Sequence, residues 1–292
     1  MTRTMRLLML ATLLASVVPA ACDRRRAVDS AGESASAQAR PIVVQGAMDL
    51  EITKLAGALH DAREEKIGGW TFWSGTLDGY PVVISKTLKG MSNAAAATVL
   101  AAEHYHPAAI INQGTAGGHQ PDLHVFDIVI GMESVNLAAF RTPYRPRGAG
   151  SIFADWHPLD LLRSEGSVSQ DPSALTMHRF HADEGLLASA RGVRDRYRRG
   201  HVVEGVIGSS DTWNSELDRI QRFHEAFGTT VEEMETASAA QIAGAFQVPF
   251  IGVRVVSNNV TNDERYDPKT GEACQDYVSD FVKRYVAARL TR

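Results

Sequence analysis

The sequence predicts an α/β protein whose first strand is buried in a parallel sheet. Residues 41–45 form a short apolar run without polar alternation, which is typical of a strand covered on both faces. A helical pattern follows at 49–60, with apolar residues recurring at helical spacing from Leu50 to Leu59. The chain has 292 residues, of which 44% are hydrophobic, and this suits one domain of about 250 residues with an appendage.

Further strand and helix patterns alternate along this domain. The strands, including a hairpin closed at Asp78 and Gly79, are expected at 70–76, 80–87, 108–112, 125–130, 202–209, 229–231 and 249–256. The helices are expected at 94–105, 215–227, 235–246 and, with one apolar face, at 277–290. Ser92 is a candidate N-cap for the helix at 94–105, and Asp211 or Thr212 for the helix at 215–227.

The amino terminus has the features of a secretory signal. Residues 1–6 carry two arginines, residues 7–18 are apolar, and small residues at 20 and 21 precede Cys22. The Ala-Ala-Cys ending resembles that of a bacterial lipoprotein signal, with Cys22 as the lipidated residue, while plain secretion with cleavage near Ala21 is the alternative. We expect an exported protein, periplasmic or anchored to the membrane through Cys22.

The segment after the signal is polar and lacks periodicity. Residues 23–40 are rich in Ser and Ala, which indicates a flexible tether. The predicted organisation is therefore a signal at 1–22, a tether at 23–40 and one folded domain at 41–292.

Composition argues against several classes of site. The formal net charge is −4 and no basic stretch is interleaved with aromatics, so nucleic acid is not an expected partner. Cys22 and Cys274 cannot build a disulfide framework or a four-ligand zinc site. His178 and His181 could hold a metal, but solvent-facing or core histidines are the preferred interpretation. We predict no metal.

Polar residues and glycines stand where the predicted strands end. The segments are 114–118, 210–214, 233–235 and 257–259, and Glu51 lies in the first turn of the first helix. Ligands bind at the carboxyl ends of strands in open α/β sheets, so we expect these segments to border a cleft. The alternatives are helix-dipole acids at the glutamates, a tight turn at the glycines and a core position for Trp213.

Five segments, in this order along the chain, resemble those of one family. They are 46–51 (GAMDLE), 112–118 (NQGTAGG), 210–213 (SDTW), 233–235 (EME) and 253–258 (VRVVSN). Together they resemble the nucleoside phosphorylase superfamily, and within it most closely the 5′-methylthioadenosine/S-adenosylhomocysteine nucleosidases. The resemblance covers about residues 41–290. It implies a three-layer α/β/α sandwich around a mixed, mostly parallel sheet, with purine nucleosides as ligands.

The resemblance also implies roles for named residues. Glu51 matches the glutamate that activates the attacking water, Glu235 the glutamate that holds the ribose hydroxyls, and Met234 the methionine packed on the sugar. Trp213 falls where the family stacks an aromatic ring on the purine. The other implied substrate-binding positions are Met48, Thr115, Gly117, Glu233, Arg254 and Ser257.

Asn258 departs from the family pattern, which has aspartate at this position to protonate purine N7. An amide cannot deliver a proton, but it can donate to N7 and can accept or donate at the 6-substituent. In the superfamily, asparagine here is associated with 6-oxopurines, as in some phosphorylases and the futalosine hydrolases. Asn259 and Asp263 are close in sequence and could supply the acid.

The residues favour water over phosphate as the nucleophile. Cleavage of an N-glycosidic bond passes through an oxocarbenium-like sugar, which a carboxylate stabilises. Segments 46–51 and 112–118 contain no Arg or Lys to hold phosphate, and Glu51 would repel it. The predicted function is hydrolysis of methylthioadenosine- or adenosylhomocysteine-type nucleosides, without a metal or an organic cofactor.

Three alternatives stay open at this point: a 6-oxopurine nucleosidase, a phosphorylase, and a non-catalytic nucleoside-binding protein on the same fold. The presence of both Glu51 and Glu235 argues against a pure binder. The family also implies a homodimer, with residues of the irregular segment 133–167 completing the site of a neighbouring subunit.

Overall fold

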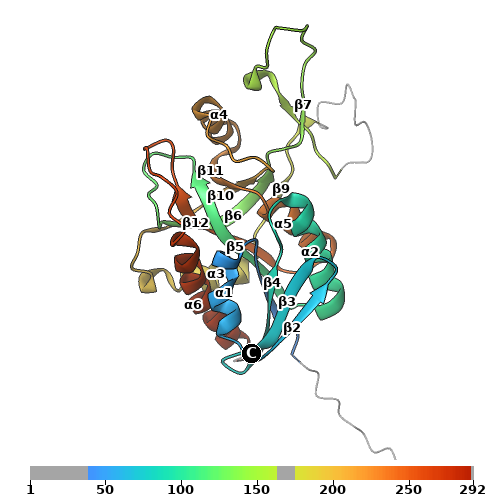
Figure 1. The fold of residues 1–292 in the computed structure, drawn as a ribbon, viewed down its shortest axis with the longest axis vertical. Coiled ribbons are helices and arrows are strands. Elements are labelled where there is room, and N and C mark those ends of the chain that lie inside the picture. The colour runs from blue at the N-terminus through green and yellow to red at the C-terminus, as the bar shows by residue number, and fades with distance from the viewer. Residues whose placement is uncertain (1–38, 163–174, 291–292) are drawn as a thin grey trace, which may run out of the picture. The chain divides into compact units, whose positions relative to one another are not determined.

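A ten-stranded mixed sheet with helices on both faces forms the body of the protein (Figure 1). The computed structural model describes residues 39–162 and 175–290. The expected signal at 1–22, the tether up to residue 38 and residues 163–167 of the irregular segment lie outside the described residues. Within the described parts, no helix is both long enough and apolar enough to cross a membrane.

The sheet follows the order β11-β10-β6-β12-β5-β1-β4-β3-β2, with β9 paired to β6. Its strands are β1 (Ile42–Gly46), β2 (His60–Ile67), β3 (Trp70–Leu77), β4 (Tyr80–Lys86), β5 (Ala109–Gly118), β6 (Ile128–Asn136), β9 (Arg179–His181), β10 (Val202–Ser209), β11 (Thr229–Glu233) and β12 (Phe250–Asn258). The central strands β4, β1, β5 and β12 run parallel, while β2, β3 and β9 join through antiparallel pairs.

The helices are α1 (Asp49–Gly57), α2 (Met91–Tyr105), α3 (Glu184–Arg191), α4 (Leu217–Phe227), α5 (Thr236–Ala245) and α6 (Thr270–Leu290). Helices α1 and α3 both pack on α6 on one side of the sheet, and α2 packs on α5 on the other (Figure 1). Strands β7 (Phe140–Arg141) and β8 (His157–Pro158) pair as a separate two-stranded ribbon, and the 3₁₀ turn η1 (Phe153–Asp155) lies between them in sequence. A second 3₁₀ turn, η3 (Arg194–Arg196), follows α3.

Two apolar cores lie on the two faces of the sheet and explain why β1 shows no polar alternation. Ile42 and Val44 join the core beneath α1 and α6, while Val43 joins the core beneath α2 and α5. A strand with helices on both faces buries every side chain, and β1 is buried throughout. The predicted three-layer α/β/α architecture is thus confirmed.

Strand β5 runs farther than the sequence predicts. The expected loop at 114–118 is the second half of this strand. There β5 pairs in parallel with β12, from Arg254 opposite Gly114, and antiparallel with β11, where Gly117 lies opposite Glu232. The glycines therefore serve close strand packing as well as ligand access.

Two helix starts differ from prediction. Helix α2 begins at Met91 with Gly90 as N-cap, so Ser92 does not cap it. The Asp211 carboxylate accepts a hydrogen bond from the Met91 N–H group at 2.7 Å and so caps α2 from another part of the chain. Helix α4 begins at Leu217 with Glu216 at its N-cap position and no side-chain cap, so neither Asp211 nor Thr212 caps it.

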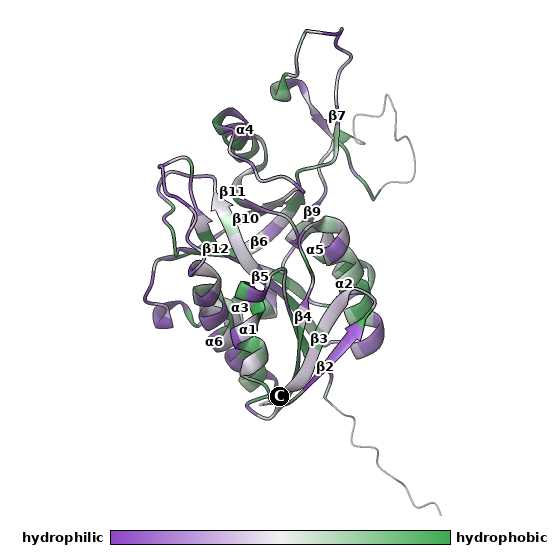
Figure 2. Cartoon of the chain, viewed as in Figure 1, coloured by the Kyte–Doolittle hydropathy of each residue, from purple (hydrophilic) through white to green (hydrophobic). Residues whose placement is uncertain are grey.

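Strand β2 was not predicted because its sequence carries no burial pattern. Seven of its eight residues are exposed, and Figure 2 shows the strand as hydrophilic. Helix α1 ends at Gly57, so His60 belongs to β2 and not to the helix. Charged edge strands of this kind resist pairing with other chains.

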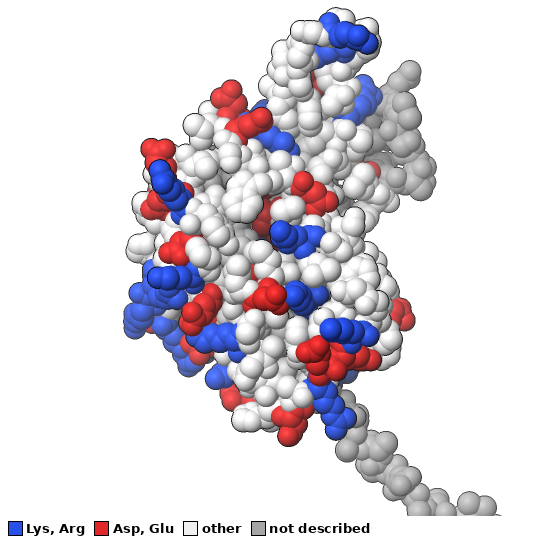
Figure 3. Space-filling model, viewed as in Figure 1, with Lys and Arg blue, Asp and Glu red and all other residues white. Residues whose placement is uncertain are grey.

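On the face seen in Figure 3, acidic and basic side chains are interspersed.

Candidate active site

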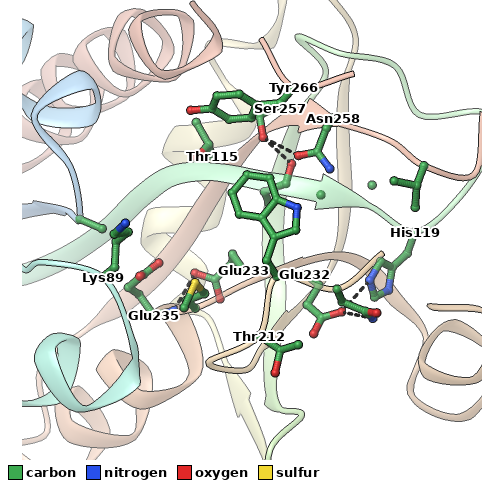
Figure 4. Close-up of a pocket in the computed structure, with 18 of the residues that line it drawn as sticks. Lys89, Thr115, His119, Thr212, Glu232, Glu233, Glu235, Ser257, Asn258 and Tyr266 are labelled. Carbon is green, nitrogen blue, oxygen red and sulfur yellow. Dashed lines mark hydrogen bonds and ion pairs between the residues drawn. The ribbon is translucent and has the colours of Figure 1, made fainter. Parts of the chain in front are cut away.

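A cavity of about 340 Å³ opens where β1, β5, β11 and β12 end (Figure 4). This volume falls within the usual range of small-molecule sites. Predicted site residues that line it are Met48, Glu51, Thr115, Gly117, Trp213, Glu233, Met234, Glu235, Ser257 and Asn258. Arg254 is the predicted site residue that does not line the cavity.

Four donors hold the carboxylate of Glu51. Its Oε2 accepts from the backbone N–H groups of Ala47 (2.9 Å) and Met48 (3.1 Å), at the start of α1. Its Oε1 accepts from the N–H group (2.8 Å) and the hydroxyl (2.9 Å) of Thr115 on β5. Glu51 is only 3% exposed and still lines the cavity. It is therefore more than a helix-dipole acid, since a second element fixes its orientation.

Residue 114 lets β5 come this close to Glu51. A Cβ atom on Gly114 would lie 2.7 Å from Glu51 Oε1 and 3.0 Å from its Cδ. Real Cβ atoms essentially never show contacts this short, so any other residue at 114 would displace the Glu51 carboxylate, and glycine allows this approach of backbone to carboxylate.

Arg254 holds Glu233 from behind the cavity wall. The guanidinium Nε donates to Glu233 Oε2 at 3.0 Å, Nη2 donates to the same oxygen, and Ser209 donates to the other. Glu233 also accepts from the N–H groups of Glu235 and Thr236 at the start of α5. Arg254 is 1% exposed, so the structure gives it the role of positioning Glu233 in place of the predicted substrate contact.

Glu235 differs from Glu233 because no cationic side chain of the described residues is directly bonded to it. Its carboxylate accepts from the Gly90 N–H group at 2.8 Å. Burial, and then the negative charge of Glu233, raise the pKa of Glu235 to about 8, although Arg254 and the Gly90 N–H group oppose the shift. Near neutral pH this side chain can therefore both donate to and accept from sugar hydroxyls.

The amide of Asn258 lies beside the Ser257 hydroxyl. This hydroxyl is 3.0 Å from Asn258 Oδ1 and 3.1 Å from the carbonyl oxygen of Ala116, and its single proton is donated to one of them at a time. The NH₂ side lies against β5, with Nδ2 3.4 Å from where a Cβ on Gly117 would stand. Asn258 thus lines the cavity with an amide that carries one donor group and one acceptor (Figure 4).

Neither neighbour suggested as a substitute acid lines this cavity. Asn259 is fully buried, and its amide donates to the carbonyl groups of Gln120 and Leu123, so it braces the loop beneath. Asp263 borders an adjoining outer hollow, which shares Trp213, Asn258, Val260 and Tyr266 with the cavity.

Trp213 is 68% exposed, so the core interpretation of this residue is wrong. It lines the cavity and meets the ring of Tyr266 edge to face at 5.7 Å between centroids. An exposed indole beside a cavity is available to stack on a flat ligand.

The cavity also contains residues with functional groups that were not predicted from the sequence, among them Lys89, His119, Glu232 and Tyr266. His119 and Glu232 are buried and joined at 3.2 Å. The only available signals were their positions beside predicted segments, at the end of the glycine run and at the start of the acidic run.

Comparison with known proteins identifies the family of this chain. Residues 41–288 match the family model of the phosphorylase superfamily. A 5′-methylthioadenosine/S-adenosylhomocysteine nucleosidase of Bacillus thuringiensis is 31% identical over 237 residues, covering 77% of this chain and 91% of that protein.

Two solved structures extend the comparison. The nucleosidase of the same name from Colwellia psychrerythraea, in complex with adenine, is 25% identical with a TM-score of 0.67, covering 85% of this chain and 96% of that one. A futalosine hydrolase of Helicobacter pylori, 22% identical with a TM-score of 0.66 and covering 84% of this chain and 99% of that one, shares the fold. The chain therefore belongs to the phosphorylase superfamily and, within it, to the 5′-methylthioadenosine/S-adenosylhomocysteine nucleosidases, which are N-glycosidic bond hydrolases.

Proposed function

We propose that this chain hydrolyses the N-glycosidic bond of purine nucleosides, with 5′-methylthioadenosine- and S-adenosylhomocysteine-type nucleosides as substrates. The observation that carries the proposal is the Glu51 carboxylate, held between α1 and β5 at the cavity wall. The names of the relatives and the adenine complex of the Colwellia structure support the choice of substrate.

In this reaction the bond between the sugar carbon and the base nitrogen breaks, and a bond to water oxygen forms. Glu51 orients the water and takes its proton, while the base leaves with the electron pair of the broken bond. The Thr115 hydroxyl is the one donor to Glu51 that can rotate away, and its rotation frees a lone pair for the water. The Asn258 amide can stabilise the leaving base by a hydrogen bond but cannot protonate it.

The charges of the cavity favour water over phosphate. Glu51, Glu232 and Glu233 line it as carboxylates, Glu235 lines it mainly in its protonated form near neutral pH, and Lys89 is the one cationic side chain on its described wall. A phosphate dianion would meet this excess of carboxylates in a partly buried space, where charge repulsion is strong.

A panel assay with Glu51→Gln tests the proposal. Methylthioadenosine, adenosylhomocysteine, adenosine, inosine and futalosine are incubated with and without phosphate, and free base is measured. We expect release without phosphate, and in Glu51→Gln a loss of turnover of about 100-fold or more with ligand binding largely kept, because the base acts on water. Wild-type turnover in the variant would overturn the assignment of Glu51.

We also propose export, with a lipid anchor on Cys22, and assembly as a homodimer. The charged, apolar and small-residue segments of 1–22 support export.

Exposed apolar side chains around the β7–β8 ribbon support contact with a second copy of the chain. They are Tyr144, Ile152, Leu161 and Leu162. A solution mass of a single chain, 31.7 kDa or less, would contradict the dimer.

A further inference from the structure

One carboxylate of the cavity has no task in the reaction described above. Glu232 lines the cavity from β11, with its side chain 4% exposed. Its Oε1 accepts from the Ser210 hydroxyl at 2.6 Å, and its Oε2 accepts from Asn214 Nδ2 at 2.8 Å and from His119 Nε2 at 3.2 Å. Because a carboxylate offers about four acceptor positions, Oε1 keeps one for a ligand.

His119 fixes this carboxylate in place. Its Nδ1 lies 2.8 Å from the Thr229 hydroxyl, and its ring stacks on Phe223 with centroids 6.4 Å apart and planes within 6°. The imidazole is therefore held at both nitrogens and on one face, and its Nε2 points at Glu232 (Figure 4). We regard His119 as a positioning residue.

Glu232 remains a hydrogen-bond acceptor despite its burial. Burial raises the pKa of a carboxyl group, but the hydrogen bonds from His119, Ser210 and Asn214 outweigh that effect and leave the pKa of Glu232 below its ordinary value. At neutral pH the group is ionised and offers only lone pairs to a ligand.

Glu232 and Asn258 flank the same residue of β5. Gly117 pairs with Glu232 of β11 on one side and with Asn258 of β12 on the other. Neighbouring strands are about 4.8 Å apart, so the two backbones are separated by roughly 10 Å. This span suits a flat base that meets a hydrogen-bonding group at each edge. In the view of Figure 4, Glu232 and His119 lie away from Lys89 and Glu235, which form the other end of the cavity.

Asn258 and Glu232 require different hydrogen-bonding groups at the two edges of the base. The Asn258 amide can donate through its NH₂ group, and the Glu232 carboxylate can only accept. A 6-oxopurine offers acceptors at O6 and N7 on one edge and an N1–H donor on the opposite edge; guanine adds a 2-amino donor there. Adenine offers a donor at its 6-position and bare lone pairs at N1 and N3, so a carboxylate facing that edge repels it.

We propose that Glu232, opposite Asn258, makes this site prefer a 6-oxopurine base over adenine on any given sugar. The inference rests on the proposed hydrolysis of purine nucleosides and sharpens its substrate class. Methylthioadenosine stays a substrate, and the corresponding methylthioinosine is the better one.

The first test compares kcat/KM for inosine against adenosine, and for methylthioinosine against methylthioadenosine. Both ratios are expected to exceed 1 in the wild type and to fall by about 10-fold or more in Glu232→Gln, the scale of one hydrogen bond to a charged group. Glu225→Gln, an exposed change on α4, is the matched control and should leave both ratios unchanged. A wild-type ratio of 1 or less, or an unchanged ratio in Glu232→Gln, would overturn the inference.

The second test needs no variant, and so does not depend on how Glu232→Gln folds. In 1-methylinosine a methyl group replaces the N1–H donor, and its kcat/KM should fall by about 10-fold or more against inosine. Equal values would refute contact with Glu232.

Binding of free hypoxanthine, guanine and adenine separates this inference from the proposed function. If no nucleoside is cleaved but hypoxanthine binds more tightly than adenine, and Glu232→Gln removes the difference, hydrolysis is refuted and the base preference stands. If nucleosides are cleaved and adenosine reacts at least as fast as inosine, hydrolysis stands and the base preference is refuted.

Discussion

At the scale of single residues, the site depends on carboxylates that occupy different environments a few positions apart. Glu233 is bonded to a buried arginine, whereas Glu235 has one backbone donor and a like charge nearby. A raised pKa means that the folded protein binds a proton at Glu235 more tightly than the unfolded chain does. The associated stability is full below the ordinary value of 4.5 and is lost as the pH rises through about 8.

This gives a prediction for Glu235→Gln, a change that mimics the protonated acid and keeps an acceptor for Gly90. The melting temperature of the variant minus that of the wild type should increase as the pH rises from about 4.5 to 8. A shift of about 2–4 °C corresponds to each 1 kcal/mol in a domain of this size. Scanning calorimetry of both proteins across this range measures the difference, in which other titrating groups cancel. A constant difference would show that Glu235 titrates normally.

The residues at strand ends could be predicted because their types stand out beside apolar strands. Glu51, Glu235 and Asn258 are examples, and all three line the cavity. Hydrogen-bond partners were not predictable in the same way. Arg254 looks like a ligand-binding residue in sequence, and only the fold shows its pairing with Glu233. The role of Glu232 depends on its hydrogen bond with His119, a residue 113 positions earlier in the sequence.

At the scale of elements, β5 organises the cavity. It pairs with β1, β12 and β11, and it carries Thr115 and Gly117 to the centre of the site. Gly114→Ala tests how closely β5 must approach Glu51, since the added Cβ would lie 2.7 Å from the carboxylate. We expect kcat to fall by about 100-fold, the scale of a displacement near 1 Å.

Gly244→Ala on α5 is the matched control for this element. A Cβ at this helical position meets nothing within 4 Å, so activity should be unchanged and stability equal or slightly higher. Wild-type kcat in Gly114→Ala would show that the contact between β5 and Glu51 is not needed.

The same scale shows why some element boundaries escaped prediction. Local sequence patterns predict β10 at its observed bounds, because an apolar run between polar turns is typical of a strand. They failed at α2, whose cap comes from Asp211, 120 residues away. They failed at β5 because glycines read as a turn when the partner strands are unknown.

At the scale of the whole molecule, two cores on the two faces of one sheet bring the strand ends to a single edge. Burial of apolar side chains on both faces is encoded strongly in sequence, so the layered fold and the place of the site could be predicted. The peripheral elements could not be predicted in this way. Strand β2 and the β7–β8 ribbon form through pairing with other strands, and their sequences carry no apolar pattern of their own.

The described residues that line the cavity all lie between Ala47 and Tyr266, and this supports a prediction about the amino terminus. If Cys22 is lipidated, the full chain expressed in a bacterium should sediment with the membranes, and Cys22→Ala should move it to the soluble periplasmic fraction. The value of kcat/KM should agree within about 2-fold between the two forms, because Cys22 is not one of the residues assigned to substrate binding or catalysis. Fractionation with nucleosidase assays on each fraction makes the measurement. A wild-type chain that is already soluble in the periplasm would refute the anchor and leave plain secretion, whereas a chain retained in the cytoplasm would refute the signal itself.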